Sequence, residues 1–224
     1  MLNLPGGERV PLKVRSIVGL IPIFAVEVLE DVVFRQLKEF AGHSRWFLEH
    51  RQDLASLVSR WHEPSRGEEH LMSLLRGHRL KALLRRMLSE DEFLSDYGVR
   101  ALSKYHDRHP FLFEHAGQQH SVSYLPAEST SSVFGGNSNW RGPIWMPVNF
   151  LLIESLNRFY RYYGPDFKVE CPTGSDIYMN LAEVATELSH RLGRLFLRDE
   201  TGHRPVLGPA PLFRDDPIRP AGPG

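Results

Sequence analysis

Residues 134–150 read Phe-Gly-Gly-Asn-Ser-Asn-Trp-Arg-Gly-Pro-Ile-Trp-Met-Pro-Val-Asn-Phe and lead directly into a long amphipathic pattern. Glycine permits positive φ and close backbone approach, whereas proline fixes φ and removes a hydrogen-bond donor. The segment therefore predicts a rigid, shaped loop that ends by starting a helix. We expect this helix to run from about Met146 to Tyr163 and to stop at Gly164. Its expected buried residues are Phe150, Leu152, Leu156, Phe159 and Tyr163.

The loop combines two broad apolar faces, Trp140 and Trp145, with hydrogen-bonding side chains. These polar side chains are Asn137, Asn139, Arg141 and Asn149. Flat apolar faces beside fixed polar groups suit a sugar ring, which presents C–H groups on one face and hydroxyls around its edge. The alternative is a buried structural loop, because Trp is highly buried on average and Asn often satisfies turns. Both interpretations fit the composition.

Apolar residues recur at three- and four-residue spacing on both sides of the loop, which indicates amphipathic helices. Asn180 and Glu183 form a capping-box pattern at the start of one of them. Its expected apolar face comprises Leu181, Val184, Ala185, Leu188, Leu192, Leu195 and Phe196. An earlier helix is expected from Leu71, Leu74, Leu75, His78, Leu83, Met87 and Leu88. Residues 14–40 read as one or two apolar helices, followed by another over 45–60.

Long connections separate these helices. Residues 106–144 and 168–179 contain many Gly, Pro, Ser and Asn residues, and loops of this length in a compact domain are usually functional. Ser89 and Glu92 are expected to cap a short segment that ends near Gly98. The sequence thus predicts an all-α fold over residues 1–207. Residues 208–224 are rich in Pro and Gly without periodicity, which predicts an irregular or disordered tail.

The composition is that of a globular protein without a strong field. The chain has 27 Lys and Arg against 27 Asp and Glu, so its overall charge recruits neither nucleic acid nor an anionic membrane. The apolar stretch 17–29 contains Pro22 and Glu27 and is too short to span a bilayer. No targeting segment is evident, and we expect a cytoplasmic protein. The single cysteine, Cys171, is expected to be a small buried residue.

Two clusters suggest other chemistry but fit it poorly. The first is a basic cluster of Arg76, His78, Arg79, Lys81, Arg85 and Arg86. It flanks an apolar stripe without aromatic interleaving and predicts a solvated helix face rather than a nucleic-acid site. The second is a set of histidines, His106, His109, His115 and His120. Their spacing matches no zinc pattern, so we expect neither a metal nor another cofactor.

The segment 134–149 resembles the signature loop of glycoside hydrolase family 63 and its mannosylglycerate hydrolase-like relatives. Supporting stretches occur in the same order at residues 12–20, 93–106, 166–174 and 195–205. The resemblance covers about residues 1–207, and the Trp-Arg-Gly-Pro-Ile-Trp core is specific. It implies an (α/α)6 toroid, of which this chain would be the C-terminal part, and inverting hydrolysis of α-linked glucosides or mannosides without a metal.

The resemblance also assigns roles to residues. Trp140 and Trp145 would stack on the sugar and Arg141 would orient it, with Asn139 beside them. Inverting hydrolysis needs a carboxylic acid and a carboxylate roughly 6.5–9.5 Å apart. In the family the acid lies N-terminal to everything that aligns here. The base lies in a Glu-Tyr-Phe-like segment beyond the match, whereas this chain has no glutamate after Glu200.

Two classes of function remain open at this point. One is a fragment of an inverting α-glycosidase that keeps part of the sugar pocket and lacks both catalytic carboxylates. The other is a non-catalytic helical module that binds sugars or a protein. Glu128, just upstream of the loop, is a candidate site carboxylate, and a substitute catalytic pair of Glu128 and Asp176 is a weaker alternative. Without the remaining helices of a toroid, apolar helix faces would be exposed and would promote self-association.

Overall fold

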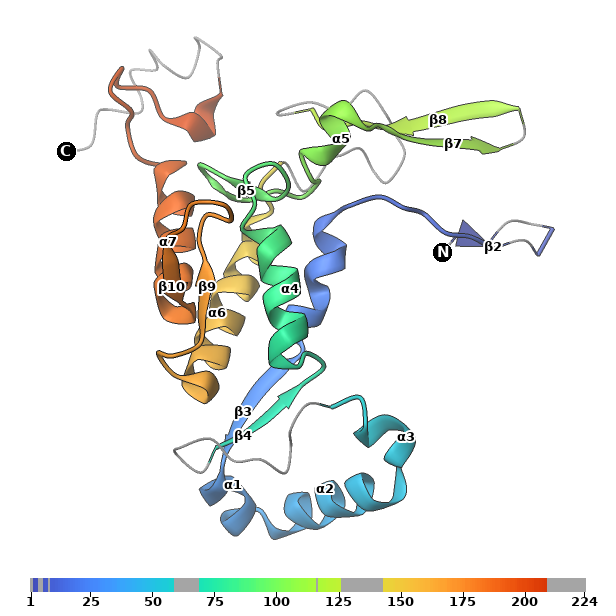
Figure 1. Ribbon diagram of the computed structural model, residues 1–224, viewed down its shortest axis with the longest axis vertical. Helices are drawn as coiled ribbons and strands as arrows, with labels where there is room; N and C mark the ends of the chain where they lie inside the picture. The colour runs from blue at the N-terminus through green and yellow to red at the C-terminus, as the bar shows by residue number, and fades with distance from the viewer. Residues whose placement is uncertain are drawn as a thin grey trace.

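The structure is a computed structural model that describes residues 2–3, 6–7, 9–58, 69–115, 117–125 and 143–208. Its helices and strands are shown in Figure 1. In chain order they are β1 (Leu2–Asn3), β2 (Arg9–Val10), η1 (Ile17–Phe24), β3 (Val26–Glu30), α1 (Asp31–Gln36), α2 (Lys38–His50), α3 (Gln52–Ala55), β4 (Glu69–Ser73), α4 (Gly77–Met87), β5 (Leu94–Ser95), β6 (Gly98–Val99), α5 (Tyr105–Arg108), β7 (Phe111–His115), β8 (Gln118–Val122), α6 (Met146–Tyr163), β9 (Lys168–Glu170), β10 (Tyr178–Asn180), α7 (Leu181–Arg194) and η3 (Pro205–Leu207).

Helices α4, α6 and α7 with η1 form the body of the molecule, and α6 lies at its centre (Figure 1). Helix α6 has the bounds that the sequence predicts. Pro147 lies in its first turn, where a missing N–H costs nothing, and Gly164 ends it at φ 73°. Leu152, Leu156 and Phe159 are fully buried along one face, as expected. The predicted burial of Phe150 is wrong: it is 59% exposed, because it lies on the opposite side of the helix from this stripe.

Helix α7 packs beside α6 and runs alongside it in the body (Figure 1). The capping box is confirmed: Oδ1 of Asn180 accepts from the N–H groups of Ala182 and Glu183, and the Glu183 carboxylate accepts from the Asn180 N–H. Its predicted stripe is buried from Leu181 to Leu192. The predicted burial of Phe196 is wrong, because the helix ends at Arg194 and Phe196 is about half exposed.

The prediction for residues 71–88 was partly wrong. Helix α4 begins at Gly77, and Leu71 belongs to strand β4. Leu74, expected on a buried face, is about half exposed. The last two predicted positions fit, because Met87 and Leu88 are completely buried, whereas Leu83 is only partly buried. The basic side chains of this helix lie in solvent, as the charge pattern predicts.

The N-terminal prediction of one or two apolar helices was also partly wrong, because a strand separates the helical segments. Residues 14–40 form η1, strand β3, helix α1 and the start of α2. Strand β3 pairs with β4 in antiparallel register, with Val26 opposite Ser73. Arg161 of α6 fastens the end of this ribbon, because its Nη2 lies 2.6 Å from Glu69 Oε1 and 3.0 Å from Glu30 Oε1.

The ribbon leads away from the body to a helical arm formed by α1, α2 and α3 (Figure 1). The expected helix over 45–60 is in fact the end of α2, which stops at His50, and the short α3; residues 59–68 lie outside the described residues. None of the three helices has a buried residue. The arm therefore contributes little to the core.

Strands modify the expected all-α class. The described residues contain five two-stranded antiparallel sheets beside the predominant helices. Two of these lie inside the stretches predicted as long loops: β7 pairs with β8, and β9 pairs with β10. Cys171, directly after β9, is completely buried, as expected. The predicted tail lies outside the described residues except for Gly208.

Candidate functional site at the start of α6

Trp145 is the one residue, among those to which the resemblance assigns a sugar contact, that lies in the described part of the chain. Glu128, Asn139, Trp140 and Arg141 all fall in residues 126–142, outside the described residues. Trp145 is the N-cap residue of α6, with φ −87° and ψ 99°. Its half-buried side chain packs against the hydrophobic core.

The residues just before Trp145 are held on one side by the extended segment that follows β6. The N–H of Ala101 donates to the carbonyl of Pro143 over 2.8 Å, and Arg100 forms an isolated antiparallel bridge with Ile144. Residues 143–145 are therefore fixed at the end of the body where α6 begins.

Asn149, which the sequence suggested as a sugar-binding arm, faces inward. It is 1% exposed, and its carboxamide is engaged by the backbone. Oδ1 accepts from the N–H of Val99 over 2.7 Å, and Nδ2 donates to the carbonyls of Val99 and Trp145, each over 3.0 Å. Its role in this structure is therefore to join α6 to β6, and it is not exposed to a ligand.

A polar network lies at the same end of the molecule and was not anticipated. Glu92 was expected as a helix cap. Its Oε1 accepts hydrogen bonds from Nη1 of Arg15 at 2.7 Å and Nη1 of Arg86 at 2.9 Å, and its Oε2 accepts from Ser103 Oγ over 3.2 Å. The guanidinium of Arg15 also lies over the Tyr105 ring, 3.5 Å from its centroid.

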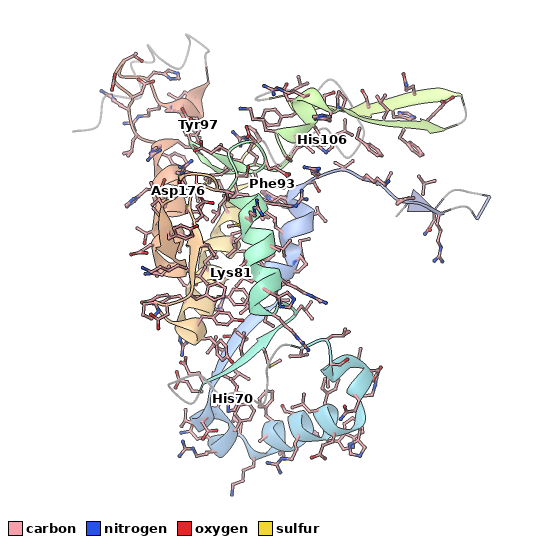
Figure 2. All side chains as sticks on the ribbon, viewed as in Figure 1. His70, Lys81, Phe93, Tyr97, His106 and Asp176 are labelled. Atoms are coloured by element: carbon pink, nitrogen blue, oxygen red, sulfur yellow. The ribbon has the colours of Figure 1, made fainter. Side chains whose placement is uncertain are left out.

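His106 belongs to this network and is buried (Figure 2). Its Nε2 accepts from the N–H of Arg15 over 2.8 Å, so Nδ1 carries the proton and donates to the carbonyl of His109 over 2.9 Å. Both ring nitrogens are therefore occupied. Among the described residues, no three His, Cys, Asp or Glu side chains gather as potential metal ligands.

Asp176, the partner in the weaker catalytic alternative, lies in the exposed loop between β9 and β10. Its backbone adopts φ 60°, and its N–H donates to Oε1 of Glu170 over 2.8 Å. Backbone hydrogen bonds from Gly174 and Asp176 lower the pKa of Glu170. Asp176 therefore lies in a self-supported turn, and Glu128 is outside the described residues.

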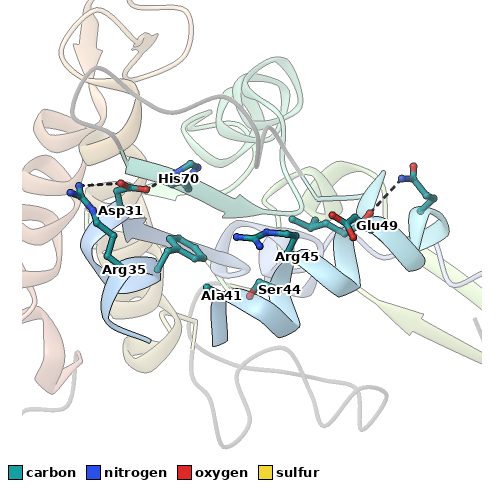
Figure 3. A pocket seen from close by; sticks show the side chains of 10 residues that line it. Asp31, Arg35, Ala41, Ser44, Arg45, Glu49 and His70 are labelled. Atoms are coloured by element: carbon teal, nitrogen blue, oxygen red, sulfur yellow. Dashed lines mark hydrogen bonds and ion pairs between the residues drawn. The ribbon is translucent and has the colours of Figure 1, made fainter. Parts of the chain in front are cut away.

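A cavity of about 530 Å³ opens between the arm and β4 (Figure 3). Asp31 is already paired there, with Arg35 at 3.1 Å and His70 at 3.7 Å. Arg45 also lines the cavity. The arm and the start of α6 lie at opposite ends of the body (Figure 1), so this cavity is separate from Trp145. None of the described helices has the length and apolarity needed to cross a bilayer.

Comparison with known proteins agrees with the signature loop. The family model for the glycosyl hydrolase family 63 C-terminal domain matches residues 70–198, more than half of the chain, including Trp145 and Asn149. The chain belongs to this family. The matched part includes α4, α6 and α7, whereas the arm lies outside it.

A relative in yeast extends the likeness beyond the family model. The chain is 48% identical over 219 residues to the uncharacterized protein YMR196W of Saccharomyces cerevisiae. The match includes 94% of this chain but spans only 20% of that relative. No solved structure matches the chain significantly.

Proposed function

We propose that this chain provides one wall of the sugar-binding site of an inverting α-glycosidase. Trp140 and Trp145 stack on the faces of a glucose or mannose unit, and Arg141 orients it by hydrogen bonds. Asn139 and Glu128 complete the polar rim. The observation that carries the proposal is the anchored Trp145 at the start of α6, within the segment that matches the family.

The proposed architecture is part of an (α/α)6 toroid. Helices α6 and α7, with α4 beside them, would supply one wall of the toroid. The sugar would bind at the end of this wall where α6 begins. The packing of α6 on α7 is the most extensive contact between elements in the described residues and supports this pairing. Loops at one end of such a barrel form the pocket, as in other folds where a rigid scaffold positions loop residues.

Hydrolysis requires two carboxyl groups, and in this proposal both come from outside the chain. One protonates the leaving oxygen while the other activates a water on the opposite face, roughly 6.5–9.5 Å away. The residues of this chain bind and orient the sugar and exclude water from one side. The chain by itself is therefore expected to bind α-glycosides without hydrolysing them.

Hydrolysis assays test this division of labour. The chain alone should release no nitrophenol from p-nitrophenyl α-glucoside or α-mannoside. The yeast relative, in which this segment is 20% of the length, should hydrolyse an α-glycoside with inversion, observed by NMR as initial release of the β-anomer. Replacing by Ala the residue that aligns with Trp145 should reduce that activity. Hydrolysis with retention, or activity that is unchanged by this replacement, would refute the proposal.

A second candidate function rests on the arm. Large apolar side chains are exposed on its helices and on the residues next to them: Val32, Leu37, Phe40, Trp46, Leu54 and Leu57. Trp46 and Leu57 are 56% and 60% exposed. Such a surface suits association with another copy or another protein. Sedimentation of the wild type and of a Trp46→Ala, Leu57→Ala variant tests self-association: the wild type should form larger species and the variant should not.

A further inference from the structure

We infer that Asn149 is a positioning residue of the sugar site, which couples the orientation of Trp145 to the β5–β6 hairpin. The inference deepens the proposed function and rests on it for its meaning in sugar binding. Its structural part concerns only the described residues around Trp145 and can be tested separately.

First, the Trp145 carbonyl oxygen is held by two hydrogen bonds. This oxygen accepts two hydrogen bonds from the same residue: the backbone N–H of Asn149 at 3.0 Å and its side-chain Nδ2 at 3.0 Å. An ordinary first helical turn supplies only the backbone bond. The second bond adds a direction, so the peptide that follows Trp145 is fixed both along the helix axis and across it.

The second step is the link to the hairpin. The same carboxamide also bonds the backbone of Val99: Oδ1 accepts from its N–H at 2.7 Å, and Nδ2, which bonds the Trp145 carbonyl, also donates to its carbonyl at 3.0 Å. Val99 is itself fully buried in β6. The carboxamide thus bridges two backbone segments that are 50 residues apart in sequence. Because Val99 is buried, loss of the carboxamide would remove the partner of its N–H and carbonyl, whereas the Trp145 carbonyl would keep only its backbone hydrogen bond.

The third step is the close fit at Gly98. Its φ of 112° is unfavourable for any residue with a side chain, and a Cβ atom there would lie 2.9 Å from Oδ1 of Asn149. The carboxamide therefore reaches the hairpin because position 98 has no side chain. The hairpin and Asn149 form one fitted unit.

The fourth step connects the hairpin to α7. Ser95 Oγ donates to the carbonyl of Gly98 over 2.7 Å, and Nη1 of the buried Arg191 donates to the carbonyl of Ser95 over 2.9 Å. A continuous path of hydrogen bonds and backbone therefore runs from Arg191 through the hairpin and Asn149 to the carbonyl of Trp145. The orientation of Trp145 is consequently set by tertiary contacts as well as by its own helix.

The test uses the whole chain labelled with 5-fluorotryptophan, with the Trp145 resonance assigned from Trp145→Phe. Asn149→Leu and Asn149→Asp should each shift or broaden the Trp145 resonance. They should also weaken binding of methyl α-glucoside about tenfold, the size of effect that misplacement of a binding group produces. The control is Leu181→Ala, which removes a buried side chain at the far end of α7. It should lower the melting temperature while leaving both readouts unchanged.

The outcomes separate the two proposals. An unchanged Trp145 resonance in both Asn149 variants, or an equal shift in Leu181→Ala, would overturn the positioning role. If the Asn149 variants alone move the Trp145 resonance but the wild type binds neither methyl α-glucoside nor methyl α-mannoside, the structural coupling stands and the proposed function fails. If an Asn149 variant does not fold, the milder Ser95→Ala, which removes one bond of the same path, replaces it with the same expected shift.

Discussion

The N–H of Arg15 donates a 2.8 Å hydrogen bond to Nε2 of His106, which ties the N-terminal segment to the start of α5. The two residues are 91 positions apart, and the same imidazole donates from Nδ1 to the carbonyl of His109. His106 is thus a bridge between backbone segments.

His106→Phe should destabilise the fold by about 1 to 3 kcal/mol, because an aromatic ring is kept while two part-buried backbone hydrogen bonds, to the Arg15 N–H and the His109 carbonyl, are lost. Urea unfolding followed by circular dichroism measures this change. The matched control is His190→Phe at an exposed position of α7, which should stay within about 0.5 kcal/mol of the wild type. Equal effects at the two positions would contradict the bridging role.

Gly98→Ala should destabilise the chain more than an ordinary glycine replacement. The new Cβ would lie 2.8 Å from Cδ2 of Leu192 in a backbone conformation that also disfavours it, so a cost of more than about 2 kcal/mol is expected. Gly19→Ala serves as the control, because its Cβ would meet nothing within 4 Å. Thermal unfolding of both variants compares them. A melting temperature of Gly98→Ala equal to that of the control would show that the hairpin is not closely fitted to α7.

Cys171 should be unreactive in the folded chain. Burial raises the pKa of its thiol to about 11, so almost no thiolate is present near pH 8. Ellman's reagent should therefore react slowly with the native protein and rapidly after denaturation in guanidinium chloride. Rapid labelling of the native chain at pH 8 would contradict the burial of this residue.

The same thiol predicts a pH dependence of stability. A raised pKa in the folded state means that the unfolded chain loses the proton first, at its ordinary value of about 8.5. The contribution of this group to stability is therefore fully present below pH 8.5 and is lost as pH rises toward 11. The free energy of unfolding should fall more steeply over this window in the wild type than in Cys171→Ala. Parallel slopes would contradict the raised pKa.

Helices α6 and α7 could be predicted from the sequence because their signals are local. Asn180 and Glu183 cap α7 within a single turn, and Gly164 ends α6 by its own backbone preference. The apolar stripe of each helix repeats over many residues, so the helical period is unambiguous. Local signals of this kind are sufficient wherever an element is long and its ends are marked.

Strand β4 could not be predicted in the same way. Leu71, Leu74 and Leu75 have helical spacing, yet residues 71–75 alternate in the structure between buried and exposed. The alternation arises because β4 pairs with β3, whose residues lie about 45 positions earlier, as the pairing of Val26 with Ser73 shows. Short apolar runs fit either period, and the distant partner decides between them.

The candidate site shows the same division. The loop sequence placed Trp145 at a helix start and suggested a sugar-facing set that included Asn149. The inward role of Asn149 depends on Val99, which no local pattern connects to it. The network of Arg15, Glu92 and His106 was likewise invisible, because its members come from three separated segments.

The most direct test of the account is a calorimetric titration of methyl α-glucoside and methyl α-mannoside into the wild-type chain, Trp145→Ala and Trp46→Ala. Trp46 is an exposed tryptophan on the arm, so its replacement controls for the loss of an indole. We expect weak binding of at least one sugar to the wild type and to Trp46→Ala, with Kd in the millimolar range, and binding about tenfold weaker or more in Trp145→Ala. Absence of binding in the wild type, or equal affinity in Trp145→Ala, would contradict the proposed sugar site.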